Sequence, residues 1–138
     1  MNTVFADTFY WIAFTNVQDV AHEKAKAFTR SATPRTIYTT QEVLIEYLNF
    51  FAGWGPHFRR KVSINIQNMQ ESRTVQIVPQ TSASFLAGLR LYRARLDKGY
   101  SLTDCISMQT MRDEGITHVL TNDMHFEQEG FRALLRDA

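Results

Sequence analysis

The chain lacks the features that mark secreted and membrane proteins. Its single cysteine, Cys105, excludes an internal disulfide and a zinc site made of several cysteines, and it suits a reducing compartment. No uninterrupted apolar run approaches the roughly 18 residues that a membrane span needs. The first apolar run has no basic start and is broken at Asp7, so it is not typical of a signal peptide. We therefore expect a cytoplasmic protein with no membrane partner.

The chain also lacks an excess of charge of either sign. Fifteen Lys and Arg against fourteen Asp and Glu give a net charge of +1, so no global positive field favours nucleic acid. Contacts with a polyanion would have to be local. Basic residues at 59–61 and between Arg90 and Lys98 are candidates, unless they only form solvated helix faces. A Gly-rich phosphate loop and the nucleophile motif of serine hydrolases are both missing.

What the chain does contain is an alternation of strand and helix patterns. With 138 residues, 44% of them hydrophobic, it fits a single domain over 1–138. The expected strands are 3–6, 36–39, 74–78 and 118–121, and the expected helices are 9–14, 19–30, 41–51, 57–68, 82–96 and a segment from Ser101 or Thr103 to about 114. Residues 131–135 form either a last strand or a helical tail. Strands that alternate with helices indicate βαβ units and a mostly parallel sheet.

Two acids lie at or just after the ends of two of these strands. Asp7 ends the first apolar run, and Asp123 comes after the run 118–121. Ligands of open α/β sheets bind outside the carboxyl ends of the strands. A third acid, Asp104, lies in the first turn of its helix, where the helix dipole favours an anion. An aspartate at this position either only stabilises the helix or is kept ionised as an oxygen ligand for Mg²⁺ or Mn²⁺.

The helix 41–51 contributes a fourth acid, Glu46. Its helical period gives one broad apolar face, made of Val43, Leu44, Tyr47, Leu48, Phe50 and Phe51. Glu46 lies at the edge of this face, where a carboxylate costs free energy unless it is paired. It is either a functional acid or an ordinary solvated residue. Glu42 lies deeper in the polar sector, three residues after Thr39, and this spacing predicts a capping box.

These residues carry a resemblance to a known family. Asp7 with Thr8, the stretch 39–46 ending in Glu46, and a C-terminal pattern together resemble PIN domains over essentially the whole chain. The C-terminal pattern consists of Tyr100, Thr103, Asp104, Met111, Arg112, Gly115, Ile116, Leu120, Thr121, Asp123, His125, Phe126, Gly130 and Phe131. The most similar members are the small stand-alone toxins of the VapC type. The resemblance implies a three-layer α/β/α sandwich around a mostly parallel sheet and a ribonuclease that depends on Mg²⁺ or Mn²⁺.

The resemblance also implies roles for individual residues. Asp7, Glu46, Asp104 and Asp123 match the acidic quartet of the family, and Thr8 and Thr121 match hydroxyl positions that support it. We expect Asp7 and Asp104 to bind the metal directly. Glu46 and Asp123 would bind a second ion, orient bound waters or help to remove a proton from the attacking water. An RNA substrate, a cognate antitoxin and a homodimer are the implied partners.

Several alternatives stay open at this stage. A PIN-like module could bind RNA or protein without turnover, whereas a receiver-like signalling domain is disfavoured because Pro79 and Gln80, rather than a phosphoacceptor Asp, follow Val78. We assign His125 to packing or hydrogen bonding in a turn, not to general-base catalysis. The aromatic segment 50–58 either packs in the core or forms an exposed patch for a protein partner.

Overall fold

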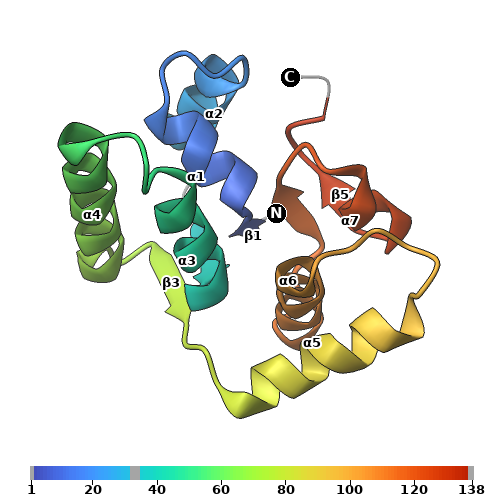
Figure 1. Ribbon diagram of the computed structural model, residues 1–138. Helices are drawn as coiled ribbons and strands as arrows, with labels where there is room; N and C mark the ends of the chain where they lie inside the picture. Colours follow the sequence, from blue (N-terminus) through green and yellow to red (C-terminus); the bar gives the residue numbers. More distant parts are fainter. Residues whose placement is uncertain (1, 32–34, 137–138) are drawn as a thin grey trace.

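The computed structural model describes residues 2–31 and 35–136 and contains a five-stranded sheet with helices on both sides (Figure 1). The elements in chain order are β1 (Thr3–Ala6), α1 (Thr8–Thr15), α2 (His22–Thr29), β2 (Thr36–Thr40), α3 (Gln41–Phe50), α4 (Pro56–Glu71), β3 (Val75–Val78), α5 (Ser82–Ala94), α6 (Leu102–Asp113), β4 (His118–Leu120), α7 (Met124–Gln128) and β5 (Arg132–Ala133). The prediction of an α/β fold that alternates strands with helices is confirmed.

The order of the strands shows that the chain reverses its winding direction beside β1. The sheet runs β3-β2-β1-β4-β5, and every pairing within the described residues is parallel. The chain first winds outward from β1 through β2 to β3 and then crosses back to β4. Because such crossovers are right-handed, α1 to α4 lie on one face and α5 to α7 on the other. The adjacent carboxyl ends of β1 and β4 therefore form the topological switch point, where open α/β sheets bind ligands.

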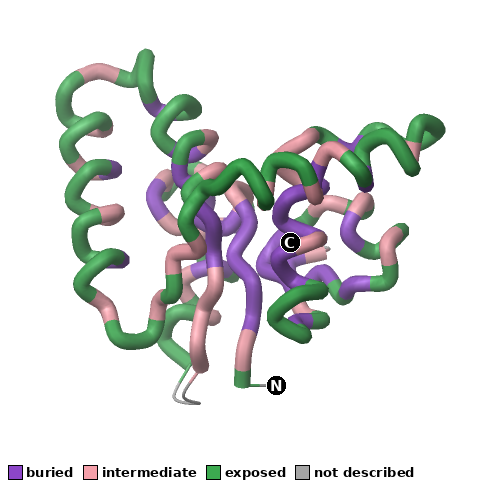
Figure 2. The backbone as a smooth tube through the Cα atoms, turned by 90° about the horizontal axis from the view of Figure 1, so that it is seen from below, coloured by how far each residue is buried: buried purple, intermediate pink, exposed green. Residues whose placement is uncertain are grey.

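The centre of the sheet is buried on both faces. Val4, Phe5 and Ala6 of β1 are all inaccessible to solvent, as are Val119 and Leu120 of β4. A strand covered by helices on both sides needs a continuous apolar run instead of an alternating one. Figure 2 shows these central strands as buried and the outer faces of the helices as exposed. The predicted three-layer α/β/α arrangement is therefore confirmed.

Several boundaries differ from the expected ones for local reasons. The helix expected over 19–30 begins only at His22, because Asp19 Oδ1 accepts a hydrogen bond from the Ala21 N–H in a preceding turn. Helix α4 is longer than expected and starts with Pro56, a residue that suits the first helical position. Residues 132–133 form a strand, which settles the alternative left open for 131–135. The short helix α7 was not predicted.

The capping of α3 also differs from the prediction. The Thr39 hydroxyl donates to the Ala6 carbonyl inside the sheet, so it is not free to cap a helix. Thr40 caps α3 instead, accepting from the Val43 N–H at 3.1 Å. The predicted capping box between Thr39 and Glu42 is therefore wrong, and Glu42 accepts a hydrogen bond from Ser84 of α5.

The apolar face of α3 is narrower than its helical period indicated. Phe51, which follows the helix, and three of its apolar residues are buried, whereas Leu48 and Phe50 are 40% and 45% exposed. Leu48 lines the grooves between α3 and α4, and the Phe50 ring lies against those of Phe51 and Trp54. Among the described residues, no helix is both long and apolar enough to cross a membrane.

Candidate active site

Asp7 lies where β1 ends and α1 begins. Its backbone N–H approaches the carbonyl of Leu120 in β4 at 3.4 Å, which joins the ends of the two central strands. The residue is only 7% exposed, and its Oδ2 accepts a hydrogen bond of 2.8 Å from Thr121 Oγ1. Burial and the charges of Asp104 and Glu46 raise the pKa of Asp7 to about 7, although the bond from Thr121 works in the opposite direction. The resulting carboxylate is buried at the switch point and destabilised by its surroundings.

Glu46 reaches the same place from the middle of α3. The hydroxyl of Thr8, the first residue of α1, donates to Glu46 Oε1 at 2.7 Å. Because β2 pairs with β1 and α3 follows β2 directly, the second turn of α3 passes the end of β1. Glu46 is therefore not an ordinary solvated residue, since it is held by the residue that follows Asp7.

Asp104 is fixed by the start of α6. Ser101 is the N-cap of this helix, which settles the choice between Ser101 and Thr103. The Ser101 hydroxyl accepts from the Asp104 N–H at 3.0 Å, and Asp104 Oδ2 accepts from the Ser101 N–H at 3.1 Å. Burial raises the pKa of Asp104, and the charges of Asp123 and Glu46 raise it further, against the hydrogen bonds from Ser101. The aspartate thus has both a capping role and a place in the acidic cluster.

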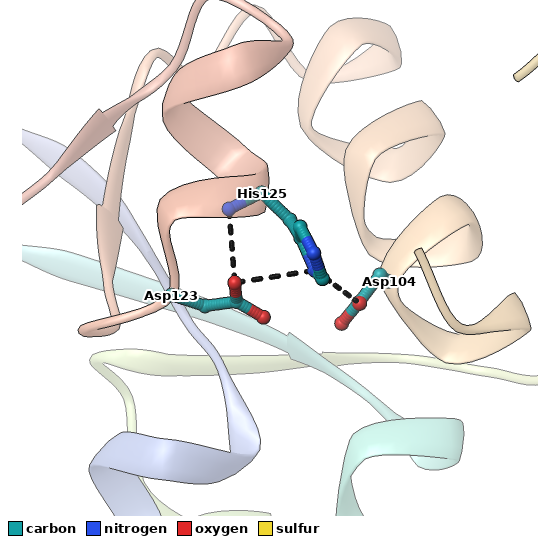
Figure 3. Close-up of side chains that lie close together, drawn as sticks. All are labelled: Asp104, Asp123 and His125. Atoms are coloured by element: carbon teal, nitrogen blue, oxygen red, sulfur yellow. Dashed lines mark hydrogen bonds and ion pairs between the residues drawn. The ribbon is translucent and has the colours of Figure 1, made fainter. Parts of the chain in front are cut away.

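Asp123 and His125 complete the cluster (Figure 3). Asp123 is the N-cap of α7, and its Oδ1 accepts from the His125 N–H at 2.9 Å. The imidazole of His125 lies between two carboxylates, with Nδ1 at 3.2 Å from Asp123 Oδ1 and 3.8 Å from Asp104 Oδ2. This buried Nδ1 forms no hydrogen bond of good geometry with the described residues. One ligand atom from each of the three side chains lies within 4.8 Å of the others, a spacing that a metal ion could bridge.

The four acids form one electrostatic cluster. Asp104 and Glu46 each raise the pKa of Asp7, and Asp123 and Glu46 raise that of Asp104. No lysine or arginine among residues 2–31 and 35–136 forms an ion pair with any of the four. Clustered and partly buried carboxylates without a cationic partner are costly unless they are protonated or bind a cation. The fold brings together the four acids that the sequence singled out, and their role in metal binding and catalysis stays a prediction.

Comparison with known proteins identifies the fold around this cluster. The family model of the PIN domain matches residues 4–131. The chain belongs to the PIN domain family. Its fold is similar to that of VapC20 from Mycobacterium tuberculosis, a toxin that cleaves the sarcin-ricin loop, with a TM-score of 0.84 and 23% identity over 96% of this chain and 98% of the other.

Two further structures share this PIN fold at lower similarity. FitAcB from Neisseria gonorrhoeae aligns with a TM-score of 0.65 and 18% identity, covering 94% of this chain and 95% of the other. VapBC2 from Rickettsia felis, solved with a DNA fragment from its promoter, aligns with a TM-score of 0.63 and 12% identity over 92% of each chain. A search of curated proteins found no significant match. The predicted resemblance to VapC-type PIN domains is confirmed.

The carboxylates of this PIN domain fit a divalent cation. They supply several oxygen ligands, as Mg²⁺ and Mn²⁺ prefer, and His125 adds a nitrogen that Mn²⁺ accepts more readily than Mg²⁺. A bound cation would also offset the repulsion that raises the pKa values of Asp7 and Asp104. From the sequence, His125 was expected only to pack or to form hydrogen bonds in a turn. Its hydrogen bond to Asp123 fits that assignment, but the ring also faces the acidic cluster.

An ion-pair network around Glu129 was not predicted. Glu129, whose side chain is 5% exposed, contacts Arg95 Nε at 2.7 Å and Arg112 Nη2 at 2.8 Å, and it accepts from the Tyr100 hydroxyl at 3.0 Å. Although burial acts in the opposite direction, these hydrogen bonds lower the pKa of Glu129 to about 2. The Tyr100 ring in turn contacts that of His125, with centroids 5.3 Å apart. Arg95, a candidate for phosphate contact in the sequence, is therefore bound to Glu129 instead.

Proposed function

We propose that this PIN protein is a Mg²⁺- or Mn²⁺-dependent endoribonuclease that hydrolyses RNA phosphodiester bonds, and that it is the toxin of a toxin–antitoxin pair. The observation that carries the proposal is the cluster of four carboxylates at the switch point of the sheet, with no lysine or arginine paired to it among the described residues. The similarity of the fold to the toxin VapC20 supports both the chemistry and the biological role.

We assign different roles to the four acids according to their positions. Asp7 and Asp104, whose pKa values are raised by burial, would hold the cation directly, and Glu46 and Asp123 would bind a second ion or orient waters around the first. When bound, the cation polarises the phosphoryl oxygens and lowers the pKa of a coordinated water. Thr8 and Thr121 keep Glu46 and Asp7 oriented through hydrogen bonds of 2.7 and 2.8 Å.

Protein partners form the second part of the proposal. A groove bounded by α3, α4 and β3 carries exposed apolar side chains, including Ile45 and Leu48, and its lining is mostly aliphatic. Exposed aliphatic surface of this kind favours a protein contact. We assign it to a homodimer or to a cognate antitoxin, and sedimentation of the purified chain alone would distinguish the two.

Cleavage of labelled total RNA tests the enzymatic proposal. The purified chain is incubated with Mg²⁺, Mn²⁺ or EDTA beside two variants of the same helix, Asp104→Asn in the cluster and Asp113→Asn at the exposed end of α6. We expect cleavage that depends on metal, is lost in Asp104→Asn and is kept in Asp113→Asn. Cleavage that continues in EDTA, or in Asp104→Asn, would contradict the proposed site.

A second candidate function is a PIN module that binds RNA or protein without turnover. Such a module would have the same fold and the same acidic cluster, so only the absence of catalysis would distinguish it from the nuclease. A folded, partner-free chain that binds Mn²⁺ by calorimetry, yet cuts no RNA in the total pool, would favour this module over the nuclease.

A further inference from the structure

The turn between α3 and α4 carries an exposed aromatic pair that the proposed active site does not use. Phe50 and Trp54 are 45% and 43% exposed, and their ring centroids are 5.5 Å apart. Beneath them, the buried Phe51 contacts both rings at 4.9 and 4.8 Å and stacks on Phe58 with an interplanar angle of 4°. The sequence left this segment open between core and surface. In the structure, Phe51 and Phe58 lie in or near the core, and Phe50 and Trp54 are exposed above them.

The backbone of the turn holds the exposed rings in place. The backbone N–H of Trp54 donates to the Phe51 carbonyl at 3.1 Å. Gly55 follows with a φ of +92°, a conformation that residues with a Cβ rarely adopt. Pro56 then starts α4 with a fixed φ. The aromatic pair is therefore presented on a defined turn and not on a loose loop.

The surroundings of the pair are positively charged. Residues 47–70 contain two arginines and a lysine but no aspartate or glutamate. Arg59 Nη1 donates to the Ala52 carbonyl at 3.0 Å, which places its guanidinium over the turn. The exposed Arg60 forms no hydrogen bond or ion pair within the described part of the chain, and both arginines line a groove between α3 and α4 with a volume of about 430 Å³. Lys61 donates to the Thr15 carbonyl and is already engaged.

The same helix connects the pair to the acidic cluster. Phe50 is four residues after Glu46, so both side chains lie on one face of α3, separated along the axis by about 6 Å. Glu46 accepts from Thr8 at the switch point. A nucleic acid strand that leaves the cluster along α3 would meet the two rings first and the arginines next.

We propose that Phe50 and Trp54 form a stacking platform for unpaired bases of an RNA strand, whose phosphates Arg59 and Arg60 contact. This inference rests on the proposed ribonuclease function and adds a binding subsite to it. Aromatic faces stack on bases of any sequence, and guanidinium groups beside them bind phosphate oxygens. A protein segment would find more aliphatic surface in the groove near Ile45, whereas this patch combines exposed rings with two arginines in a stretch, 47–70, that contains no aspartate or glutamate.

Binding of a short single-stranded oligoadenylate in EDTA tests the platform without any cleavage. Trp54→Leu and Phe50→Leu keep an apolar side chain but remove the aromatic face, so we expect each to weaken binding about tenfold. The matched control is Phe85→Leu on α5, where the ring is 48% exposed, and its affinity should equal that of the parent chain. In Arg60→Gln, the slope of log affinity against log salt should become shallower by about 0.7.

The fluorescence of Trp54 gives a second, direct measurement. The only other tryptophan, Trp11, is 6% exposed, so a stacked base should quench the solvent-exposed component of the emission. Trp54→Phe should bind oligoadenylate with near-parental affinity but show no such quenching. The helical circular dichroism and melting temperature of each variant establish that it is folded.

The outcomes separate this inference from the proposed nuclease. Oligoadenylate that does not bind the parent chain, or that binds folded Trp54→Leu as tightly as the parent, overturns the platform even if RNA is cleaved. A Trp54→Leu variant that dissociates a dimer while binding RNA normally would also overturn it and would mark a protein contact. Binding that depends on Trp54 in a chain that never cleaves RNA would support the platform and reject the nuclease.

Discussion

Replacing Asp7 by asparagine should stabilise the metal-free protein at alkaline pH. The carboxyl is buried, and its pKa is raised from 3.8 to about 7 by burial first and by the charges of Asp104 and Glu46 next. The asparagine has nearly the same shape, and its carbonyl oxygen can still accept the hydrogen bond from Thr121. The substitution therefore removes a destabilising charge and little else.

The sign and size of this effect follow from proton linkage. Between pH 3.8 and about 7, the folded state keeps a proton on Asp7 that the unfolded chain has lost. The free energy of unfolding therefore decreases as the pH rises through this window and is level above it. A difference of roughly three pH units corresponds to about 4 kcal/mol, an upper bound because the charges of the cluster are coupled. At about 3 °C per kcal/mol, the melting temperature would differ by about 10 °C.

Urea unfolding in EDTA at about pH 8 and about pH 4 measures the difference between parent and Asp7→Asn. We expect a clear gain in the variant at the higher pH and almost none at the lower. Added Mn²⁺ should raise the stability of the parent and have much less effect on the variant. Asp113→Asn, at the exposed end of α6, is the control and should change neither value. A variant that is less stable than the parent at about pH 8 without metal would refute the reasoning.

Four further substitutions probe helix caps, the ion pairs of Glu129 and the packing of α5 on α6. Ser101→Ala removes one of the two capping boxes and should cost about 1 kcal/mol, as should Thr81→Ala in the other, but only Ser101→Ala should weaken Mn²⁺ binding measured by calorimetry. Glu129→Gln should cost about 2 kcal/mol at neutral pH in urea unfolding, because two partly exposed arginines lose their partner. In the parent, this contribution should be lost as the pH falls from 4.5 toward about 2. Gly88→Ala places a Cβ 2.4 Å from Ile106 Cγ1 and should lower the melting temperature by separating α5 from α6, and an unchanged value would contradict this packing.

Much of the fold could be predicted because its local signals agree with its global arrangement. The central strands are uninterrupted apolar runs that stop at Asp7 and just before Asp123, so strand positions and candidate site residues came from the same pattern. Asp104 was found for a similar reason, since a helix start and an acid coincide there. Glu46 had the weakest local signal, and only its place in the family pattern separated it from a solvated residue.

The features that were missed depend on contacts between distant segments. The helical period of α3 does not show how far neighbouring elements cover each apolar residue, so the sequence placed Leu48 and Phe50 on a buried face although both are partly exposed. The Thr39 hydroxyl is committed to a neighbouring strand, a bond that local capping rules do not include. Glu129 lies between Gln128 and Gly130 in sequence, and its arginine partners lie 34 and 17 positions away. Pairings at such separations carry no periodic signal.

The structure also offers a way to distinguish acids that bind metal from acids that stabilise the fold. The hydrogen bonds that orient the carboxylates of the cluster come from neutral donors, among them a hydroxyl for Asp7 and Glu46 and a backbone N–H for Asp104 and Asp123. These donors fix the geometry but leave the repulsion within the cluster largely uncompensated, so neutralising Asp7 or Asp104 should stabilise the metal-free protein and weaken metal binding together. Glu129 faces two arginines, and neutralising it should destabilise the protein with or without metal. The opposite signs follow from the partners of each carboxylate, because Asp7 faces other acids whereas Glu129 faces two arginines.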